Sequence, residues 1–287
     1  MKKLLFLFLT LAGSLAAFSF DWPQKEIASN SFHSYFGQLR GGTLGNSIVF
    51  KESSPVKSAD QGTIVCIIKE HDESMGWFES PLGNAVIINH HNQLSSVYGN
   101  IDKESMNPEL EKKFEIEKSF SIGESGNSGW QEGSSCLEFQ VYDTKNKSSV
   151  NPRILMPRIG QELELWPGDL FLVDRNGNNF NLSDRKYLKS GNYALYRSRQ
   201  ITAVPYRTTV YINGASMENI YYDTLRESEG RLCLVGNGNY PVDAVYPDST
   251  KQLLGFIRLT RGQNSLSVSL SDILGSVKSA SYLLIVN

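Results

Sequence analysis

Residues 121–143, SIGESGNSGWQEGSSCLEFQVYD, constrain the fold of this chain more than any other stretch. Glycines at positions 123, 126, 129 and 133 favour a tight loop, because glycine adopts backbone conformations that other residues avoid. Residues 136–141 then alternate between apolar and polar side chains, as a strand with one buried face does. The stretch therefore predicts a turn-rich loop that leads into a half-buried strand.

Short strand-like runs precede this stretch, and Gly, Pro, Asn and Ser separate them. They cover residues 48–50, 62–69, 84–89 and 95–98. Short runs with turn residues between them are typical of an all-β domain. Residues 101–118 differ, because charges of both signs alternate there without an apolar stripe. This charged segment indicates a solvated connector, and a partner-docking insertion is the alternative.

Three motifs follow one another in this part of the chain. PVKSADQGTIV covers residues 55–65, GNAVIINH covers 83–90 with SVYGNI at 96–101, and IGESGNSG with CLEF closes the series at 122–139. Their order and spacing resemble the motifs of lysostaphin-type (LytM-type) zinc endopeptidases of the cell wall. Those enzymes have His-Leu-His-Phe where this chain has CLEF. The resemblance covers about residues 40–155 and implies a domain built on a central β-sheet.

The resemblance also implies a zinc site, and the sequence lacks its residues. Family members supply a His and an Asp four residues later from a first motif, one His ligand from the last motif, and two more His for the proton and the oxyanion. A catalytic zinc needs three protein ligands and one open position for water. Here residues 40–54 contain neither His nor Asp, and the other positions hold Asn100, Cys136 and Glu138.

These losses predict no catalytic residue, no metal ligand and no cofactor. We expect a relict groove around Asn100, Cys136 and Glu138 that serves as a binding site. The alternative is an active zinc-dependent cell-wall metalloendopeptidase with a rearranged metal site. In that case Cys136 and Glu138, on the same face of the strand, would bind the ion together with Glu52.

The remaining His and Cys residues indicate no further catalytic motif. His90 and His91 follow the run at 84–89 and are expected in a surface turn. Three cysteines make no disulfide framework. Cys66 and Cys136 are the pair that an exported protein could oxidise, and buried free thiols are the alternative.

The first 19 residues have the pattern of a signal peptide. Lys2 and Lys3 precede an apolar run at 4–17, and small residues follow it. No later run approaches the ~20 apolar residues that a membrane span needs. Without the two lysines the chain has 26 basic and 30 acidic residues, which gives no electrostatic reason to expect nucleic acid or anionic lipid as a partner. We expect an exported protein, either periplasmic or extracellular.

A length of 287 residues fits two domains of about 150 residues each, and Pro152 and Pro157 indicate the boundary. We predict a signal peptide at 1–19, a degenerate lysostaphin-type peptidase domain at 20–157 and a second β domain at 158–287. The second domain has short alternating runs at 163–166, 171–173, 180–182, 193–196, 208–212, 231–235, 254–259, 265–270 and 282–286. Asn-Gly pairs at 176–177 and 213–214 predict hairpin turns.

Nine short runs predict a β-sandwich for the second domain. Its closing sequence, FIRLTRGQNSLSVSLSDILGS, resembles bacterial immunoglobulin-like modules. Four tyrosines in this part are expected in the core, with a ligand-binding face as the alternative. They are Tyr211, Tyr221, Tyr222 and Tyr240.

The combined pattern predicts an all-β, exported, peptidase-like protein without catalytic activity, that is, a pseudoenzyme. The resemblance implies that such a protein binds cell-wall peptidoglycan or regulates a cell-wall hydrolase such as an amidase. A structural or adhesive envelope protein is a further alternative.

Overall fold

A computed structural model describes residues 20–25, 30–70, 80–129, 136–158, 160–184 and 187–287. The predicted signal peptide at 1–19 lies outside these residues. The described chain is mostly β-strand, with two short 3₁₀-helices and one four-residue α-helix. No helix in the described ranges has the length and apolar character needed to cross a membrane.

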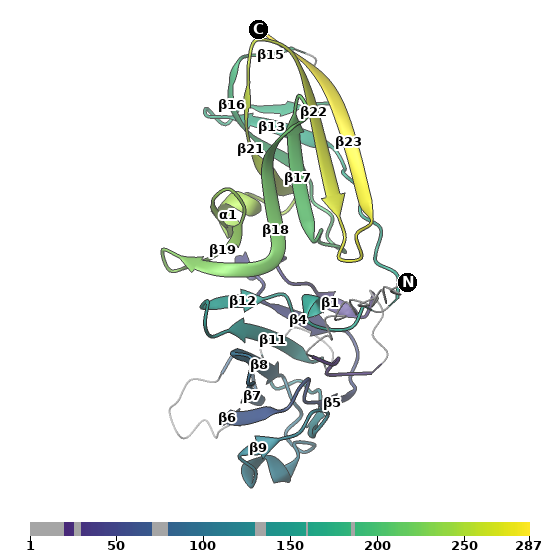
Figure 1. The fold of residues 1–287 in the computed structure, drawn as a ribbon, viewed down its shortest axis with the longest axis vertical. Coiled ribbons are helices and arrows are strands. Elements are labelled where there is room, and N and C mark those ends of the chain that lie inside the picture. The colour runs from purple at the N-terminus through teal and green to yellow at the C-terminus, as the bar shows by residue number, and fades with distance from the viewer. Residues whose placement is uncertain (1–19, 26–29, 71–79, 130–135, 159, 185–186) are drawn as a thin grey trace, which may run out of the picture.

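The first part of the chain forms the lower half of the molecule in Figure 1. It comprises β1 (Phe32–Ser34), β2 (Leu39–Arg40), β3 (Thr43–Leu44), β4 (Ser47–Phe50), β5 (Pro55–Lys57), β6 (Gly62–Ile68), β7 (Ala85–Asn89), β8 (Leu94–Gly99), η2 (Pro108–Glu111), β9 (Glu115–Ile116), β10 (Ser121–Glu124), β11 (Glu138–Asp143), β12 (Ser148–Val150) and η3 (Pro152–Ile154). Strands at all five predicted places in this part confirm the alternation argument. The charged connector contains one short 3₁₀-helix, η2, and Leu110 anchors it in the core.

The second part forms the upper half. It comprises β13 (Leu170–Asp174), β14 (Asn179–Asn181), β15 (Tyr187–Leu188), β16 (Gly191–Ser198), β17 (Arg207–Ile212), β18 (Ala215–Ser228), β19 (Arg231–Val235), β20 (Asn239–Pro241), α1 (Val242–Val245), β21 (Lys251–Leu259), β22 (Gly262–Ser271) and β23 (Val277–Val286). Both Asn-Gly turns are confirmed as hairpins, β13–β14 and β17–β18. At the second turn Asn213 and Gly214 have φ values of 51° and 81°, which glycine and asparagine tolerate.

In the second part, one predicted strand is absent and one long strand lies where none was predicted. Residues 163–166 form no strand, although their side chains alternate. The longest strand, β18, was not predicted, because Glu, Asn and Asp recur along it and these residues are uncommon in strands. Its alternate residues are nevertheless buried, since β18 pairs with β17 on one side and with β12 and β19 on the other.

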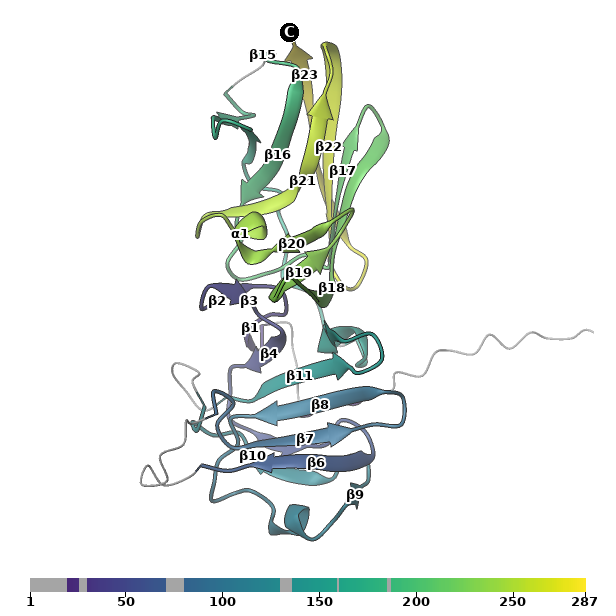
Figure 2. The ribbon, with the colours of Figure 1, turned by 90° about the vertical axis from the view of Figure 1, so that its left-hand side faces the viewer.

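One sheet connects the two parts of the chain. Its strands follow the order β15-β23-β22-β17-β18-β12-β11-β8-β7-β6-β9, and β4 also pairs with β11. The junction is the antiparallel pair β12–β18, in which Ser148 lies opposite Arg226 and Val150 opposite Thr224. Figure 2 shows β11, β8, β7 and β6 as successive strands of this sheet below the junction.

In the second part, two sheets face each other across a shared core. The four-stranded sheet β14-β13-β16-β21 supplies Leu172, Leu195 and Ile257, and the opposite sheet supplies Val268 and Leu284. The second part is therefore β-structured around its own core, and its immunoglobulin-like nature stays a prediction.

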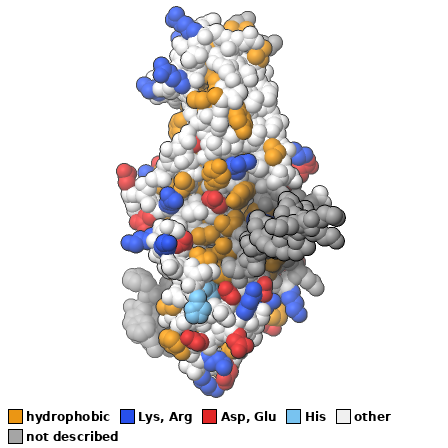
Figure 3. Space-filling model, in the orientation of Figure 1, with side chains coloured by type: hydrophobic (Ala, Val, Ile, Leu, Met, Phe, Trp, Pro, Cys, Tyr) orange, Lys and Arg blue, Asp and Glu red, His pale blue; other side chains and the backbone are white. Residues whose placement is uncertain are grey.

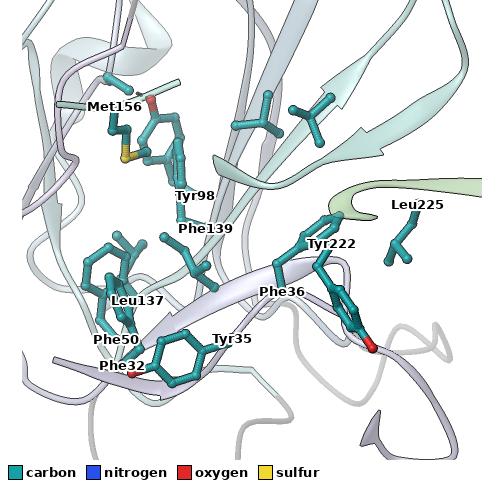
Figure 4. Packing of buried hydrophobic residues seen from close by; sticks show 14 of the residues in the cluster. Phe32, Tyr35, Phe36, Phe50, Tyr98, Leu137, Phe139, Met156, Tyr222 and Leu225 are labelled. Atoms are coloured by element: carbon teal, nitrogen blue, oxygen red, sulfur yellow. Dashed lines mark hydrogen bonds between the residues drawn. The ribbon is translucent and has the colours of Figure 1, made fainter. Parts of the chain in front are cut away.

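The first core contains side chains from both sides of the predicted boundary. Phe36 and Tyr222 both belong to it, and Figure 4 shows them beside each other. The Tyr246 hydroxyl donates to the carbonyl of Gly37 at 2.9 Å. Asn151 Nδ2 donates to the carbonyl of Tyr222 at 2.8 Å. The predicted boundary at 157 and 158 is thus spanned by buried contacts.

The four tyrosines divide between core and surface. Tyr222 and Tyr240 are buried, as expected for core residues. Tyr211 and Tyr221 are half-buried on β17 and β18. The Tyr240 hydroxyl donates to the buried carboxylate of Glu218, which fixes β20 against β18.

His90 is buried, so the prediction of a surface turn is wrong for this residue, whereas His91 is exposed. The Nδ1 of His90 lies 2.7 Å from the carbonyl oxygen of Gln61, and the Nε2 of His90 lies 2.8 Å from Ser96 Oγ. The Ser96 hydroxyl in turn lies 3.1 Å from that of Tyr98. Because a carbonyl oxygen can only accept, Nδ1 carries the hydrogen. Burial lowers the pKa of His90 and keeps the ring neutral.

The lowered pKa of His90 predicts a loss of stability in mild acid. The unfolded chain binds a proton near the ordinary His pKa of about 6.5, whereas the folded chain resists it, so stability is full above that pH and falls below it. Replacing His90→Gln should flatten the dependence by up to about 1.4 kcal/mol per pH unit. Urea unfolding at several pH values between about 7.5 and 5.5 measures this, and equal slopes for both proteins would contradict it.

Gly37 tests the packing between the two parts of the chain. Its φ is +78°, and a Cβ there would lie 2.8 Å from Tyr222 Cδ1. Gly41 is the matched control, because its φ is +55° and nothing lies within 4 Å of the same position. Alanine should cost about 1 kcal/mol at either site through backbone strain.

Gly37→Ala should therefore destabilise the chain by about 1–3 kcal/mol more than Gly41→Ala, because overpacking against the Tyr222 ring is added. The free energy of unfolding in urea measures the difference. Equal losses would mean that Tyr222 is not tightly packed at this junction.

Candidate functional site

The sheet register brings the predicted groove residues together. Strand β11 lies between β8 and β4, so Glu138 is opposite Gly99 on one side and Val49 on the other. Asn100 directly follows β8, and Cys136 lies two residues before the first residue of β11. The three residues that the motif resemblance selected therefore meet at one end of the sheet.

Asn100 fastens the glycine loop to this end of the sheet. Its Nδ2 donates to the carbonyls of Gly126 at 2.7 Å and Cys136 at 2.6 Å. Its Oδ1 accepts from the amide of Gly129 at 2.8 Å. Asn100 has a φ of 62°, a conformation that Asn tolerates better than most residues. All hydrogen-bonding groups of this side-chain amide are thus used to hold the loop.

Gly126 in the loop and Gly83, which precedes β7 and lies against the loop, are needed for close backbone contacts. A Cβ on Gly126 would lie 2.6 Å from the backbone of Asp102. On Gly83, which has a φ of +63°, a Cβ would lie 2.3 Å from the carbonyl carbon of Ser128. Backbone atoms cannot move aside as a flexible side chain can, so a side chain at either position would displace the loop. The glycine pattern therefore serves loop packing.

Glu138 is a buried carboxylate that Arg40 and Ser47 compensate. Arg40 Nη1 and Nη2 donate to the two carboxylate oxygens at 3.1 Å each. The Ser47 hydroxyl donates to Oε1 at 2.8 Å, and Gln140 Nε2 does so at 3.3 Å. Glu138 is 6% exposed, whereas the Arg40 side chain is 34% exposed. The bidentate ion pair satisfies the charge that burial would otherwise penalise.

Sequence reasoning did not identify Arg40 and Ser47. Both lie within residues 40–54, where the resemblance predicts a His and an Asp and the sequence has neither. One signal was present: Glu138 stands in an otherwise apolar strand, and a buried acid needs a cation or several donors. The sequence offered several cations, and only the fold selects Arg40.

Cys136 is a buried free thiol. It is 4% exposed, and Asn100 Nδ2 lies 3.6 Å from its sulfur. Burial raises the pKa of the Cys136 thiol, which keeps it protonated near neutral pH. Cys66 is a free thiol as well and lies exposed on β6, so the pairing of Cys66 with Cys136 does not occur.

The residues at this site do not fit zinc. The Glu138 carboxylate is bound by a guanidinium, the Asn100 amide donates its hydrogens to carbonyls, and the Cys136 thiol is protonated. Zinc ligands must instead offer free lone pairs, and thiols must be deprotonated. The described residues contain no group of three or more His, Cys, Asp or Glu arranged to hold a metal ion, and Glu52 is exposed.

All three residues selected from the sequence are buried. Asn100 is fully covered, and Cys136 and Glu138 are nearly so. Among the described residues of the cluster, Arg40 is the charged group that reaches the surface. The site therefore presents a guanidinium to solvent, with its carboxylate partner beneath.

Comparisons with known proteins assign the first part of the chain. Residues 42–152 match the model of Peptidase family M23, which confirms a lysostaphin-type domain in this part. A second family model, whose description names no activity, matches residues 165–287.

Individual relatives are distant. An uncharacterized protein of Treponema pallidum (strain Nichols) is 27% identical over 132 residues, which is 43% of this chain and 87% of the relative. The crystal structure of a SpoIIIAH and SpoIIQ complex contains a chain similar over 48% of this chain and 99% of that one, with 18% identity and a TM-score of 0.37. A zinc-containing peptidase from Vibrio cholerae is similar over 44% of this chain and 37% of its own, with 20% identity and a TM-score of 0.34.

The Arg40–Glu138 pair predicts an asymmetric effect of mutation. Arg40→Gln leaves a buried carboxylate without its cation and should cost about 1–3 kcal/mol, less than for a fully buried pair because Arg40 is partly exposed. Arg231→Gln is the matched control, because Arg231 forms an exposed pair with Asp243 and should cost less than about 1 kcal/mol. Urea unfolding measures both losses.

A double variant completes this test. Combining Arg40→Met with Glu138→Met removes both charges and should be more stable than Arg40→Met alone, because no unpaired charge remains buried. The role of the ion pair would be refuted if Arg40→Gln cost no more than Arg231→Gln.

Proposed function

We propose that this protein is an exported, non-catalytic, peptidase-like protein that binds cell-wall peptidoglycan or regulates a cell-wall hydrolase. One observation carries the proposal. The carboxylate of Glu138, at one of the two positions where the family's last motif has His, accepts two hydrogen bonds from the Arg40 guanidinium.

The Arg40 guanidinium already neutralises the charge of Glu138, and its own positive charge opposes the binding of a metal ion. A divalent ion beside Glu138 would meet the positive charge of Arg40 at short range, where charges interact strongly. It would also have to displace the Ser47 hydroxyl from Oε1. Cys136 could become a ligand only after losing a proton that burial holds on it. Peptide hydrolysis by a zinc-bound water would therefore lack its metal.

The scaffold of the peptidase domain is nevertheless kept in detail. Asn100 holds the glycine loop, and β11 stays paired between β4 and β8. A fold can serve a different function when its site changes, because function depends on the site residues. Binding a wall strand or a protein needs this surface and no metal. The M23 match over residues 42–152 supports a role in the cell wall.

The second part would act as an attached binding or spacing module. Its two facing sheets and separate core support the immunoglobulin-like sandwich indicated by the sequence. The signal-peptide pattern at 1–19 supports export, to the periplasm or the exterior. No nucleic acid partner is proposed, because the formal charge of the chain is negative.

Zinc content tests the loss of catalysis. The mature chain, purified without chelator or His tag, should contain less than about a tenth of an equivalent of zinc by elemental analysis. It should also leave purified wall fragments uncleaved with or without added zinc. Near one equivalent, with chelator-sensitive cleavage, would establish the alternative of an active metalloendopeptidase with a rearranged site.

Binding assays with the wall and with its hydrolases test the binding role in this proposal. The mature chain should cosediment with purified peptidoglycan, or retain an identified cell-wall hydrolase from envelope extract and change its rate of wall lysis. Gln140 is half-buried beside Glu138, so Gln140→Trp should weaken binding about tenfold by blocking this face. Arg226→Gln, at an exposed position of β18, is the control and should leave the binding unchanged. Binding to neither the wall nor a hydrolase would refute the proposal.

A further inference from the structure

A cavity of about 660 Å³ opens on the outer face of the four-stranded sheet in the second part of the chain. Strands β13, β16 and β21 form its floor, and Met217 of β18 closes one side. This volume is within the range of sites that hold small molecules or short peptide segments. The cavity is far in sequence from the M23-type residues, and its analysis does not depend on the function proposed above.

The register of the three strands arranges the floor in rows. Phe171, Tyr196 and Leu253 face one another in the first row. The second row consists of Val173, Ala194 and Phe256. In the third row Asn192 is opposite Arg258, and Arg175 follows directly after the end of β13 on the other side. Two apolar rows are thus bordered by a row with two cations.

Ala194 creates the hollow. The first row is largely covered, because Tyr196 and Leu253 belong to the first core. In the second row the small side chain of Ala194 lies between Val173 and Phe256, and Phe256 remains 51% exposed. Tyr240 packs against the Phe256 ring, with 5.8 Å between the ring centroids, and the space over Ala194 remains an apolar hollow.

The rim of the cavity carries two cations, Arg175 and Arg258, and the carboxylate of Asp174. Arg175 and Arg258 are exposed, and neither forms an ion pair with a described Asp or Glu. The neighbouring carboxylate of Asp174 is used within the β13–β14 turn, where it accepts from Asn178 Nδ2 and from the amides of residues 176 and 178. At the upper end of Figure 3, blue and orange side chains gather, and the red ones lie lower.

We propose that this cavity binds a segment of a partner protein in which a carboxylate stands next to apolar side chains. The apolar side chains occupy the hollow over Ala194, against Val173 and Phe256. The carboxylate lies at the third row, where Arg175 and Arg258 donate to it. Asn192, whose side-chain amide has no hydrogen-bond partner among the described residues, pairs with the backbone of the segment.

Peptide chemistry fits these features better than a lipid surface. The cavity is concave, whereas a membrane surface would engage protruding apolar side chains. Asn192 lies between the two arginines and offers both a donor and an acceptor, which a peptide bond matches. The charge complementarity of two unpaired arginines selects an acidic segment.

Paired synthetic peptides test the proposal. The probes are fluorescein-labelled pentapeptides with one central Glu flanked by Phe, Leu or Val, each matched by a peptide with Gln in place of Glu. Fluorescence polarisation with the mature full chain measures their affinity. We expect Glu peptides to bind about tenfold tighter than their Gln partners, and added salt to weaken the binding.

Substitutions in the chain locate the site. Ala194→Leu fills the hollow and should lower the affinity of the Glu peptides by about tenfold or more. Arg175→Gln and Arg258→Gln should each reduce the affinity several-fold and reduce the preference for Glu over Gln. The matched controls are Ala215→Leu and Arg226→Gln, at exposed positions of β18, which should leave the affinity unchanged. The thermal midpoint of each variant shows whether it has folded. If Ala194→Leu does not fold, the two arginine variants still test the proposal, because they are at exposed positions.

Three outcomes would overturn the proposal. One is that no Glu peptide binds at concentrations up to about 1 mM, the weak limit for specific recognition. Another is equal affinity in Arg258→Gln and the unchanged chain. The third is that vesicles of anionic phospholipid bind through Arg175 and Arg258 while the peptides do not, which would make this end of the molecule a membrane contact.

Discussion

A buried carboxylate organises the candidate site of this protein. Glu138 is buried at the start of β11, between β4 and β8, where an unpaired charge would cost several kcal/mol. Arg40 approaches from the β2–β3 hairpin and Ser47 from β4, so the compensation also fixes those elements against β11. The same guanidinium that stabilises the fold supplies the positive charge that a metal would otherwise bring. The Arg40–Glu138 ion pair therefore both stabilises this part of the fold and makes the site unsuited to zinc.

The glycine loop explains how a peptidase scaffold persists apart from its chemistry. Gly83 and Gly126 allow backbone segments to approach to distances that no side chain would permit. Asn100 then ties the loop down through an amide that uses all its hydrogen bonds. These are packing requirements, and they are independent of whether a metal is bound. Both glycines lie within residues 42–152, which match the model of Peptidase family M23.

Features that depend on residues close together in the sequence were predictable, and features that depend on distant residues were not. Strands with clear alternation, such as β7 and β11, and the Asn213-Gly214 turn were predicted, because alternation and local backbone preference act over a few residues. Strand β18 was not, because its polar residues are accommodated by neighbours distant in sequence. His90 was placed on the surface for the same reason: its partners Gln61 and Ser96 become neighbours only in the folded sheet.

Residue identity and short spacing are enough to specify the mostly β architecture, the M23-type motifs and the replacement of the expected zinc ligands. Tertiary structure alone decided which cation meets Glu138, that Phe36 packs with Tyr222 in a core that crosses the predicted boundary, and that Ala194 lies between Val173 and Phe256 under two unpaired arginines. Each of these depends on contacts between segments far apart in the chain. Local preference cannot specify such contacts, because burial energy is gained only when the whole sheet forms.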